Sequence, residues 1–302
     1  MRAAVNRGPY LAIALAIVAV SCATPLIQST QSPTLVVAAW RMLLASVILL
    51  PFALRAPDLW TLSRRDLGLL AATGLVLAVH FAAWITSLKE AAVPTVSSLV
   101  LVTSHPLLVA AASTILFRER LRPLTLAGVG LGLAGVAVIA LGGPSATFLG
   151  NSLAFLGGVM AGIYLLAGRH LRKRLSLATY AFVVYAIAAV ALFSGTVLSG
   201  ISPLPVGGGA EWLVLLGLAG ISQIGGHTLY NWALKHVPAT LVSVSLLGEP
   251  IGGTLLSAVF LGTVVPQFAA IGAMLALPGI VVTAYSLQRG KADSVPVAEK
   301  TK

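Results

Sequence analysis

The sequence predicts an all-α polytopic membrane protein with ten transmembrane helices, arranged as two inverted five-helix repeats. Its composition places the chain in a bilayer: 58% of the residues are hydrophobic and 9% are charged, whereas a soluble protein carries about 25% charged residues. The mean hydropathy is +0.99. The positions of the basic residues and an internal repeat then predict how the spans are arranged.

Apolar runs separated by short polar or Pro/Gly-rich breaks divide nearly the whole chain. A helix needs about 20 apolar residues to cross the hydrocarbon core, and helices satisfy their own backbone hydrogen bonds in lipid. We therefore expect ten helical spans followed by a disordered tail at 289–302. The expected spans are 9–29, 34–55, 67–88, 93–117, 124–143, 148–169, 178–200, 212–234, 239–262 and 265–287.

Basic residues predict the orientation of these spans. Seventeen of the nineteen Lys and Arg residues fall on the same side, which also holds both termini, while Lys89 falls on the other side and Arg41 within a span. Because Lys and Arg collect in cytoplasmic loops, both termini are expected in the cytoplasm. The segment ending at Cys22 faintly resembles a bacterial lipoprotein signal. Cleavage there would leave nine spans, and the charge pattern argues against it.

The two halves of the chain match at a shift of 144 residues. VPTVSSLVLVTSHP (93–106) aligns with VPATLVSVSLLGEP (237–250), and Gly128 and Gly135 fall on Gly272 and Gly279. Five spans per repeat is an odd number, so the second copy must be inverted relative to the first. Inverted repeats are typical of secondary transporters. We predict a first repeat at 1–145 and a second at 146–288.

Several other classes of protein do not fit this sequence. The net charge of +11 follows from the topology, so no nucleic-acid partner is expected. A single cysteine excludes a disulfide within the chain and a Cys-based metal cluster. The sequence has no phosphate-binding loop, nucleophile elbow or metal-ligand spacing. We therefore expect no catalytic residue, metal or cofactor, and no enzyme activity.

Two longer stretches resemble the ten-helix EamA-type members of the drug/metabolite transporter superfamily. They are SHPLLVAAASTILFRERLRPLTLAGVGLGLAGVAVI (104–139) and GEPIGGTLLSAVFLGT (248–263). In that family the fourth helix of each repeat carries a proline and then a Gly-Glu-like end. Here Arg118-Glu119 and Gly262-Thr263 occupy those ends, so the second copy lacks the acid. The layout is similar to that of bacterial exporters of aromatic and other neutral amino acids.

The resemblance implies a secondary transporter, an exporter of amino acids or related small metabolites by alternating access, in the bacterial inner membrane. Its partners would be an amino-acid-like solute and the lipid bilayer, and the protein would act as a monomer or homodimer. One alternative is a translocator of nucleotide sugars, sugar phosphates or lipid head groups, but such ligands need several basic residues and only Arg41 lies within a span. An alternative of another class is a membrane-embedded enzyme or channel.

Two polar residues lie at equivalent depths in the fourth and ninth spans. His105 comes 11 residues after Pro94, and Glu249 comes 11 residues after Pro238. Ionisable residues within spans mark substrate or proton pathways, so Glu249 is a candidate site for a substrate ammonium or a proton. The alternative is that Glu249 accepts backbone hydrogen bonds at a helix break or pairs with His105. The prolines that follow, Pro106 and Pro250, are candidate gating positions.

Arg41 is the basic residue within a span. Its planar guanidinium suits a substrate carboxylate. Alternatively, it extends to the outer headgroups or closes a gate with Glu249.

Aromatic and imidazole side chains predict the cavity wall. His80 and Trp84 lie one helical turn apart, and His227, Tyr230 and Asn231 share a helix face. Tyr164 lies in the middle of its span. Alternatively, Trp84 belongs to the aromatic belt at the membrane interface, because it lies near a span end.

Pairs of glycine at a four-residue spacing let helices approach closely. We assign a packing role to Gly128, Gly132, Gly158, Gly162, Gly248 and Gly252.

Overall fold

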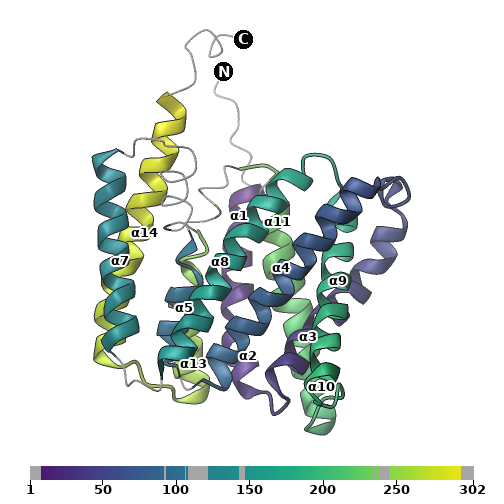
Figure 1. Ribbon diagram of the computed structural model, residues 1–302, viewed down its shortest axis with the longest axis horizontal. Coiled ribbons are helices and arrows are strands. Elements are labelled where there is room, and N and C mark those ends of the chain that lie inside the picture. The colour runs from purple at the N-terminus through teal and green to yellow at the C-terminus, as the bar shows by residue number, and fades with distance from the viewer. Residues whose placement is uncertain are drawn as a thin grey trace.

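The computed structural model describes residues 8–91, 93–105, 107, 122–142, 147–233, 235–237, 242 and 245–293, and their regular structure is helical throughout (Figure 1). In chain order the elements are α1 (Gly8–Ser21), α2 (Ala23–Ser29), α3 (Thr34–Leu54), the 3-10 helix η1 (Pro57–Leu59), α4 (Arg64–Lys89), α5 (Thr95–Val102), α7 (Pro123–Gly142), α8 (Phe148–Leu171), α9 (Leu177–Leu198), α10 (Gly208–Gly217), the π-helix η3 (Leu218–Thr228), α11 (Leu229–Ala233), α13 (Gly248–Leu261) and α14 (Gln267–Asp293).

Seven helical stretches within the described residues are long and apolar enough to cross a membrane. They coincide with the first three expected spans and with the fifth to the eighth. The tenth expected span lies within α14, and the fourth and ninth are described only in part, as α5 and α13. The structure is thus that of a multi-pass membrane protein, while the count of ten spans stays a prediction.

Two of the expected spans are irregular. The first is divided at Cys22, where α1 gives way to α2. The eighth begins as α10, widens into the π-helix η3 and ends as α11. Wider π turns occur often at functional sites, because they turn side chains away from the regular helix face.

Helices α7 and α14 form a closely packed pair at one edge of the molecule, on the left in Figure 1. Glycines from both helices make this approach possible. A Cβ atom added to Gly128 would lie 2.7 Å from the backbone nitrogen of Thr283, and one added to Gly272 would lie 2.9 Å from the carbonyl oxygen of Gly135. Backbone therefore contacts backbone along this interface.

The remaining helices interleave the two halves of the chain. Helix α3 packs on α9, and α4 packs on both α8 and α9. The largest apolar cluster fills these contacts with bulky side chains, among them Phe81, Trp84, Tyr180 and Tyr185. This packing brings α4, from the first half, against α8 and α9 of the second half, and it places the His80 and Phe81 rings beside His227 of η3, where the candidate site lies.

The connections between helices gather on two opposite sides. Those between α3 and α4 and between α8 and α9 lie at the top of Figure 1, and those after α2, α9 and α13 lie at the bottom. The two upper connections bind one another: Arg174 pairs with Asp66 at 2.6 Å, and the Ser176 backbone N–H donates to Asp58 at 2.7 Å. Burial would raise the pKa of Asp58, but hydrogen bonds from Ser176 and Thr179 hold it below its ordinary value.

Candidate functional site

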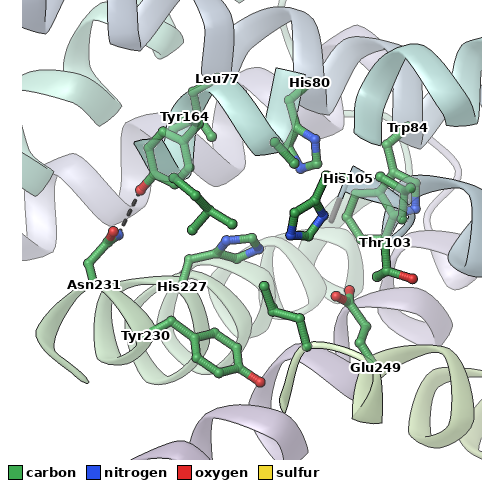
Figure 2. Close-up of a pocket in the computed structure, with 14 residues that line it drawn as sticks. Leu77, His80, Trp84, Thr103, His105, Tyr164, His227, Tyr230, Asn231 and Glu249 are labelled. Carbon is green, nitrogen blue, oxygen red and sulfur yellow. Dashed lines mark hydrogen bonds between the residues drawn. The ribbon is translucent and has the colours of Figure 1, made fainter. Parts of the chain in front are cut away.

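A cavity lies in the interior between helices of both halves. In this conformation the cavity is narrow, with about 40 Å³ of space for water-sized molecules. Figure 2 shows polar side chains from several elements converging on this space. Its lining comprises Leu77, His80, Trp84, Val102, Thr103, His105, Ala161, Tyr164, Leu165, His227, Tyr230, Asn231, Leu246 and Glu249.

Two helix breaks at equivalent positions of the halves form one wall of the cavity. Helix α5 ends at Val102, and α13 begins at Gly248 after a turn. At the 144-residue shift the two breaks coincide, and His105 and Glu249 follow them. Side-chain hydroxyls add a hydrogen bond to the turn before each break: Ser104 donates to the Leu101 carbonyl at 2.7 Å and Ser245 to the Val242 carbonyl at 2.7 Å, and each carbonyl also accepts a backbone N–H.

The Glu249 carboxylate and the His105 ring point toward one another across the cavity (Figure 2). Both residues are buried. Within the described residues no hydrogen bond or ion pair reaches the Glu249 carboxylate, so the alternative in which it accepts backbone hydrogen bonds finds no support there. Pairing with His105 likewise does not occur in this structure. Glu249 therefore presents an unpartnered acceptor to the cavity.

An aromatic and imidazole wall comes from α4 and η3. The His80 Nδ1 lies 2.8 Å from the Gly157 carbonyl oxygen, and because a carbonyl only accepts, Nδ1 carries the donated proton. The His80 ring stacks on Trp84 with centroids 5.9 Å apart and lies 6.4 Å from the His227 ring. The residues predicted to share a face of the third and eighth spans are thus brought to one cavity.

Opposite this wall, Asn231 donates a hydrogen bond of 2.7 Å from Nδ2 to the Tyr164 hydroxyl, drawn as a dashed line in Figure 2. Tyr164 comes from α8 and Asn231 from α11, so the bond joins two helices of the second half. Tyr230, also in the lining, belongs to the same short helix.

Arg41 lies outside the lining but directly behind it. Its Nε donates to Gln223 Oε1 at 2.9 Å, and its guanidinium carbon lies 4.3 Å from the Phe81 ring centre. The side chain is 0% exposed, so the alternative in which it extends to the headgroups is wrong. The belt alternative is also wrong for Trp84, which is 1% exposed. Arg41 and Glu249 interact electrostatically but form no ion pair.

The glycines assigned to packing lie at close helix contacts. A Cβ on Gly158 would lie 2.8 Å from the carbonyl oxygens of Leu101 and Val102, and one on Gly162 would lie 3.2 Å from the His105 Cβ. Gly248 and Gly252 lie against α1, where Ile17 and Ser21 fill the space that a side chain would need.

The gating candidates are described unequally. Pro250 is buried in the first turn of α13, while Pro106 lies outside the described residues.

Sequence reasoning missed the residues that hold Arg41. Gln223 lies in η3, four residues before His227, and Thr228 connects it to α9: the Thr228 hydroxyl lies 2.9 Å from the Tyr185 hydroxyl and donates to the Gln223 carbonyl at 3.1 Å. A glutamine in an apolar span is itself a signal of function. The four-residue spacing to His227 places both residues on one helix face.

A comparison with known protein families identifies the family to which the chain belongs. The model of the EamA-like transporter family matches the chain twice, at residues 7–141 and 148–285, once in each half. The chain belongs to this family. It is therefore a transporter of the drug/metabolite transporter superfamily, built from two copies of one family unit.

Solved structures agree with this EamA-like fold. One, described only as the crystal structure of a protein, is 24% identical with a TM-score of 0.62, and the match covers 94% of this chain and 97% of that one. No curated protein matches the chain.

At the lower side of Figure 1, this EamA-like transporter has a polar clamp on residues 31–34, which join α2 to α3. The Glu211 carboxylate accepts the backbone N–H groups of Gln31 and Ser32, both at 3.0 Å. Lys89 donates to the Ser32 carbonyl at 2.5 Å, and Glu90 accepts the Thr34 N–H at 3.1 Å. Glu211 belongs to the second half and residues 31–34 to the first, so the clamp joins the two.

Proposed function

We propose that this transporter moves amino acids or related small metabolites across the bacterial inner membrane by alternating access, with export as its direction. The family establishes transport, and the cavity supports this class of substrate. Its lining is largely apolar and aromatic, with a few polar groups that can fix a ligand.

The observation that carries this proposal is the unpartnered carboxylate of Glu249. A buried acid without a hydrogen bond is costly, and an ammonium group entering the cavity supplies both a counter-charge and donors. Phosphorylated substrates would instead need several cationic side chains. Arg41 is the sole Lys or Arg buried in the interior of the described helices, and this argues against that alternative.

The two matching breaks support an inverted repeat and alternating access. His105 and Glu249 follow equivalent breaks and lie on the same cavity, one from each half. In inverted repeats the substrate site lies between the copies, and rocking of one copy against the other exposes it to each side in turn. Helix α13, which starts at the second break, is the moving element that we propose.

The clamp on residues 31–34 closes the external side in this proposal. Basic residues gather in the connections of the opposite side, which by the positive-inside rule is cytoplasmic, together with both termini. Lys89, the sole basic residue that the topology assigns to the external side, takes part in the clamp.

We expect Glu211→Gln to loosen this external closure. Losing a charge-assisted hydrogen bond is worth about 1.5 kcal/mol or more, so the open population should rise about tenfold. The measurement is the labelling rate of a single cysteine at Gln28 by an impermeant maleimide, with Cys22→Ser removing the native thiol. Asp66→Asn, at the other end of α4, is the control and should leave the rate unchanged. Equal rates in Glu211→Gln and the parent would contradict the role of the clamp.

Counterflow in proteoliposomes tests the substrate class. Vesicles loaded with unlabelled neutral or aromatic amino acids should accumulate the labelled compound transiently, and vesicles loaded with sugar phosphates or nucleotide sugars should not. The rate should saturate with substrate concentration, as expected of a carrier and not of a channel. Exchange of phosphorylated compounds alone would overturn the proposal in favour of the translocator.

A further inference from the structure

Arg41 is fully buried, and only one of its three guanidinium nitrogens forms a hydrogen bond within the described residues. Nε donates to Gln223 Oε1 at 2.9 Å, which fixes the plane of the group. One face lies over the Phe81 ring at 4.3 Å, and the Trp84 ring lies 6.0 Å away. Aromatic faces attract cations but accept no strong hydrogen bond.

The remaining donors in this place are unused. Arg41 Nη1, Arg41 Nη2 and Trp84 Nε1 are all buried, and none has a hydrogen-bond partner among the described residues. A buried cation with unmade hydrogen bonds is strongly unfavourable unless an acceptor arrives. Because Arg and Trp side chains only donate, the missing partner is an acceptor, and the positive charge of Arg41 favours an anionic one.

The anion has a defined shape. With Nε taken by Gln223, the free end of the guanidinium presents Nη1 and Nη2 side by side, and such a fork fits the two oxygens of one carboxylate. Trp84 connects this fork to the cavity, since it lines the cavity wall and also lies beside the guanidinium. The Phe81 ring, 4.3 Å from the guanidinium carbon, also lies 4.6 Å from the His80 ring and 5.6 Å from the His227 ring, which line the cavity.

The charges of Glu249 and Arg41 are complementary. Glu249 is an unpartnered acceptor on the cavity and Arg41 an unpartnered donor behind its wall, and the two interact electrostatically without forming an ion pair. The other titratable groups facing Arg41 are His80, His227 and Tyr185.

We propose that Arg41, positioned by Gln223 and assisted by Trp84 Nε1, forms a carboxylate subsite, and that the ligand is a zwitterion whose ammonium meets Glu249. This inference rests on the proposed function and deepens it: the substrates are amino acids with a free carboxylate rather than amines or amides. Binding displaces Phe81, which opens the wall between the cavity and the fork.

Isothermal titration calorimetry on the purified full chain tests the subsite with matched ligands, L-phenylalanine and L-phenylalaninamide. The wild type should bind the acid about 10- to 100-fold more tightly than the amide, since hydrogen bonds to charged groups contribute about 1.5–3 kcal/mol. Arg41→Gln should bring this ratio close to one by weakening the acid alone. Arg41→Lys keeps the charge without the fork and should give an intermediate ratio.

The variant Gln223→Glu is a control for the possibility that replacing Arg41 weakens binding only by destabilising the protein. The new carboxylate pairs with Arg41 internally, so the variant should unfold at a temperature no lower than the wild type while losing its preference for the acid. An acid-to-amide ratio that stays at the wild-type value in Arg41→Gln and Gln223→Glu overturns the subsite. So does a wild type that binds both ligands equally.

Failure of the subsite and failure of the proposed function remain distinguishable. If the wild type and Arg41→Gln exchange amino acids equally well in counterflow, only the subsite proposal fails. If no amino acid exchanges, the proposed function fails, and the subsite is judged on 3-phenylpropionate alone. Absence of binding of this carboxylate to the wild type then overturns the subsite too.

Discussion

Replacing Glu249 with Gln is expected to reduce amino-acid exchange about 10- to 100-fold at low substrate concentration. The amide keeps the size of the carboxylate but loses the charge, and a charge-assisted hydrogen bond contributes about 1.5–3 kcal/mol. The carboxylate forms no hydrogen bond within the described residues, so the substitution breaks none, although it removes the electrostatic interaction with Arg41. The measurement is the initial rate of counterflow in proteoliposomes with equal amounts of protein.

The same variant tests a proton role for Glu249. His80, His105, His227 and Tyr230 face the cavity with it, and Arg41 lies behind the wall. If protons bind Glu249 during the cycle, any dependence of uptake on an imposed pH gradient should disappear in Glu249→Gln. Asp66→Asn is the matched control, because this acid lies at the start of α4 in a capping box away from the cavity. Uptake that responds to the gradient as in the wild type would refute the proton role, and unchanged exchange would refute the ammonium site.

Several residues that the sequence singles out line one cavity, while their role in binding stays a prediction. The repeat placed His105 and Glu249 at equal depth, and both lie on the cavity after equivalent helix breaks. The helical spacings of His80 with Trp84 and of His227 with Tyr230 also predicted shared faces. These inferences depend on periodicity and on the cost of polar groups in lipid, which act locally and are therefore readable along the chain.

What the sequence could not predict depends on contacts between distant segments. Arg41 and Gln223 are 182 residues apart and meet only because α3 packs on η3. Trp84 lies near a span end, where an aromatic belt was a reasonable alternative, yet it is buried against α8: a Cβ added to Gly157 would lie 3.3 Å from the Trp84 Cβ. The π-helix of the eighth span likewise has no simple local signal.

The clamp was missed for a related reason. Glu211 lies just outside the expected eighth span and belongs to the start of α10, so its position in the sequence gives no sign of a role. Its significance comes from the two backbone N–H groups of residues 31 and 32, which no spacing in the sequence relates to it. Lys89, Glu90 and Glu211 are distant from residues 31–34 in the sequence, so their convergence on this segment is seen only in the folded structure.

Replacing Gly135 with Ala is expected to separate α7 from α14 and to destabilise the protein by about 3 kcal/mol or more, the upper end of the usual cost of overpacking. A Cβ there would collide with the backbone nitrogen of Ala276 and would lie 2.6 Å from the carbonyl oxygen of Gly272. Neither is the end of a flexible side chain, so the helices themselves must move. The measurement is the unfolding temperature of the purified protein in detergent, which should fall by several degrees.

Gly130 provides the matched control within the same helix. It is exposed, and a Cβ added to it would have no atom within 4 Å. Since Ala favours a helix over Gly by about 1 kcal/mol, Gly130→Ala should keep or raise the unfolding temperature. If both variants unfold like the wild type, the glycines of α7 and α14 do not set their approach. Neither α7 nor α14 contributes a lining residue among those described. We therefore expect Gly135→Ala alone to lose stability, while the protein that stays folded still exchanges substrate. That result would mean that the α7–α14 pair braces a cavity formed by the other helices.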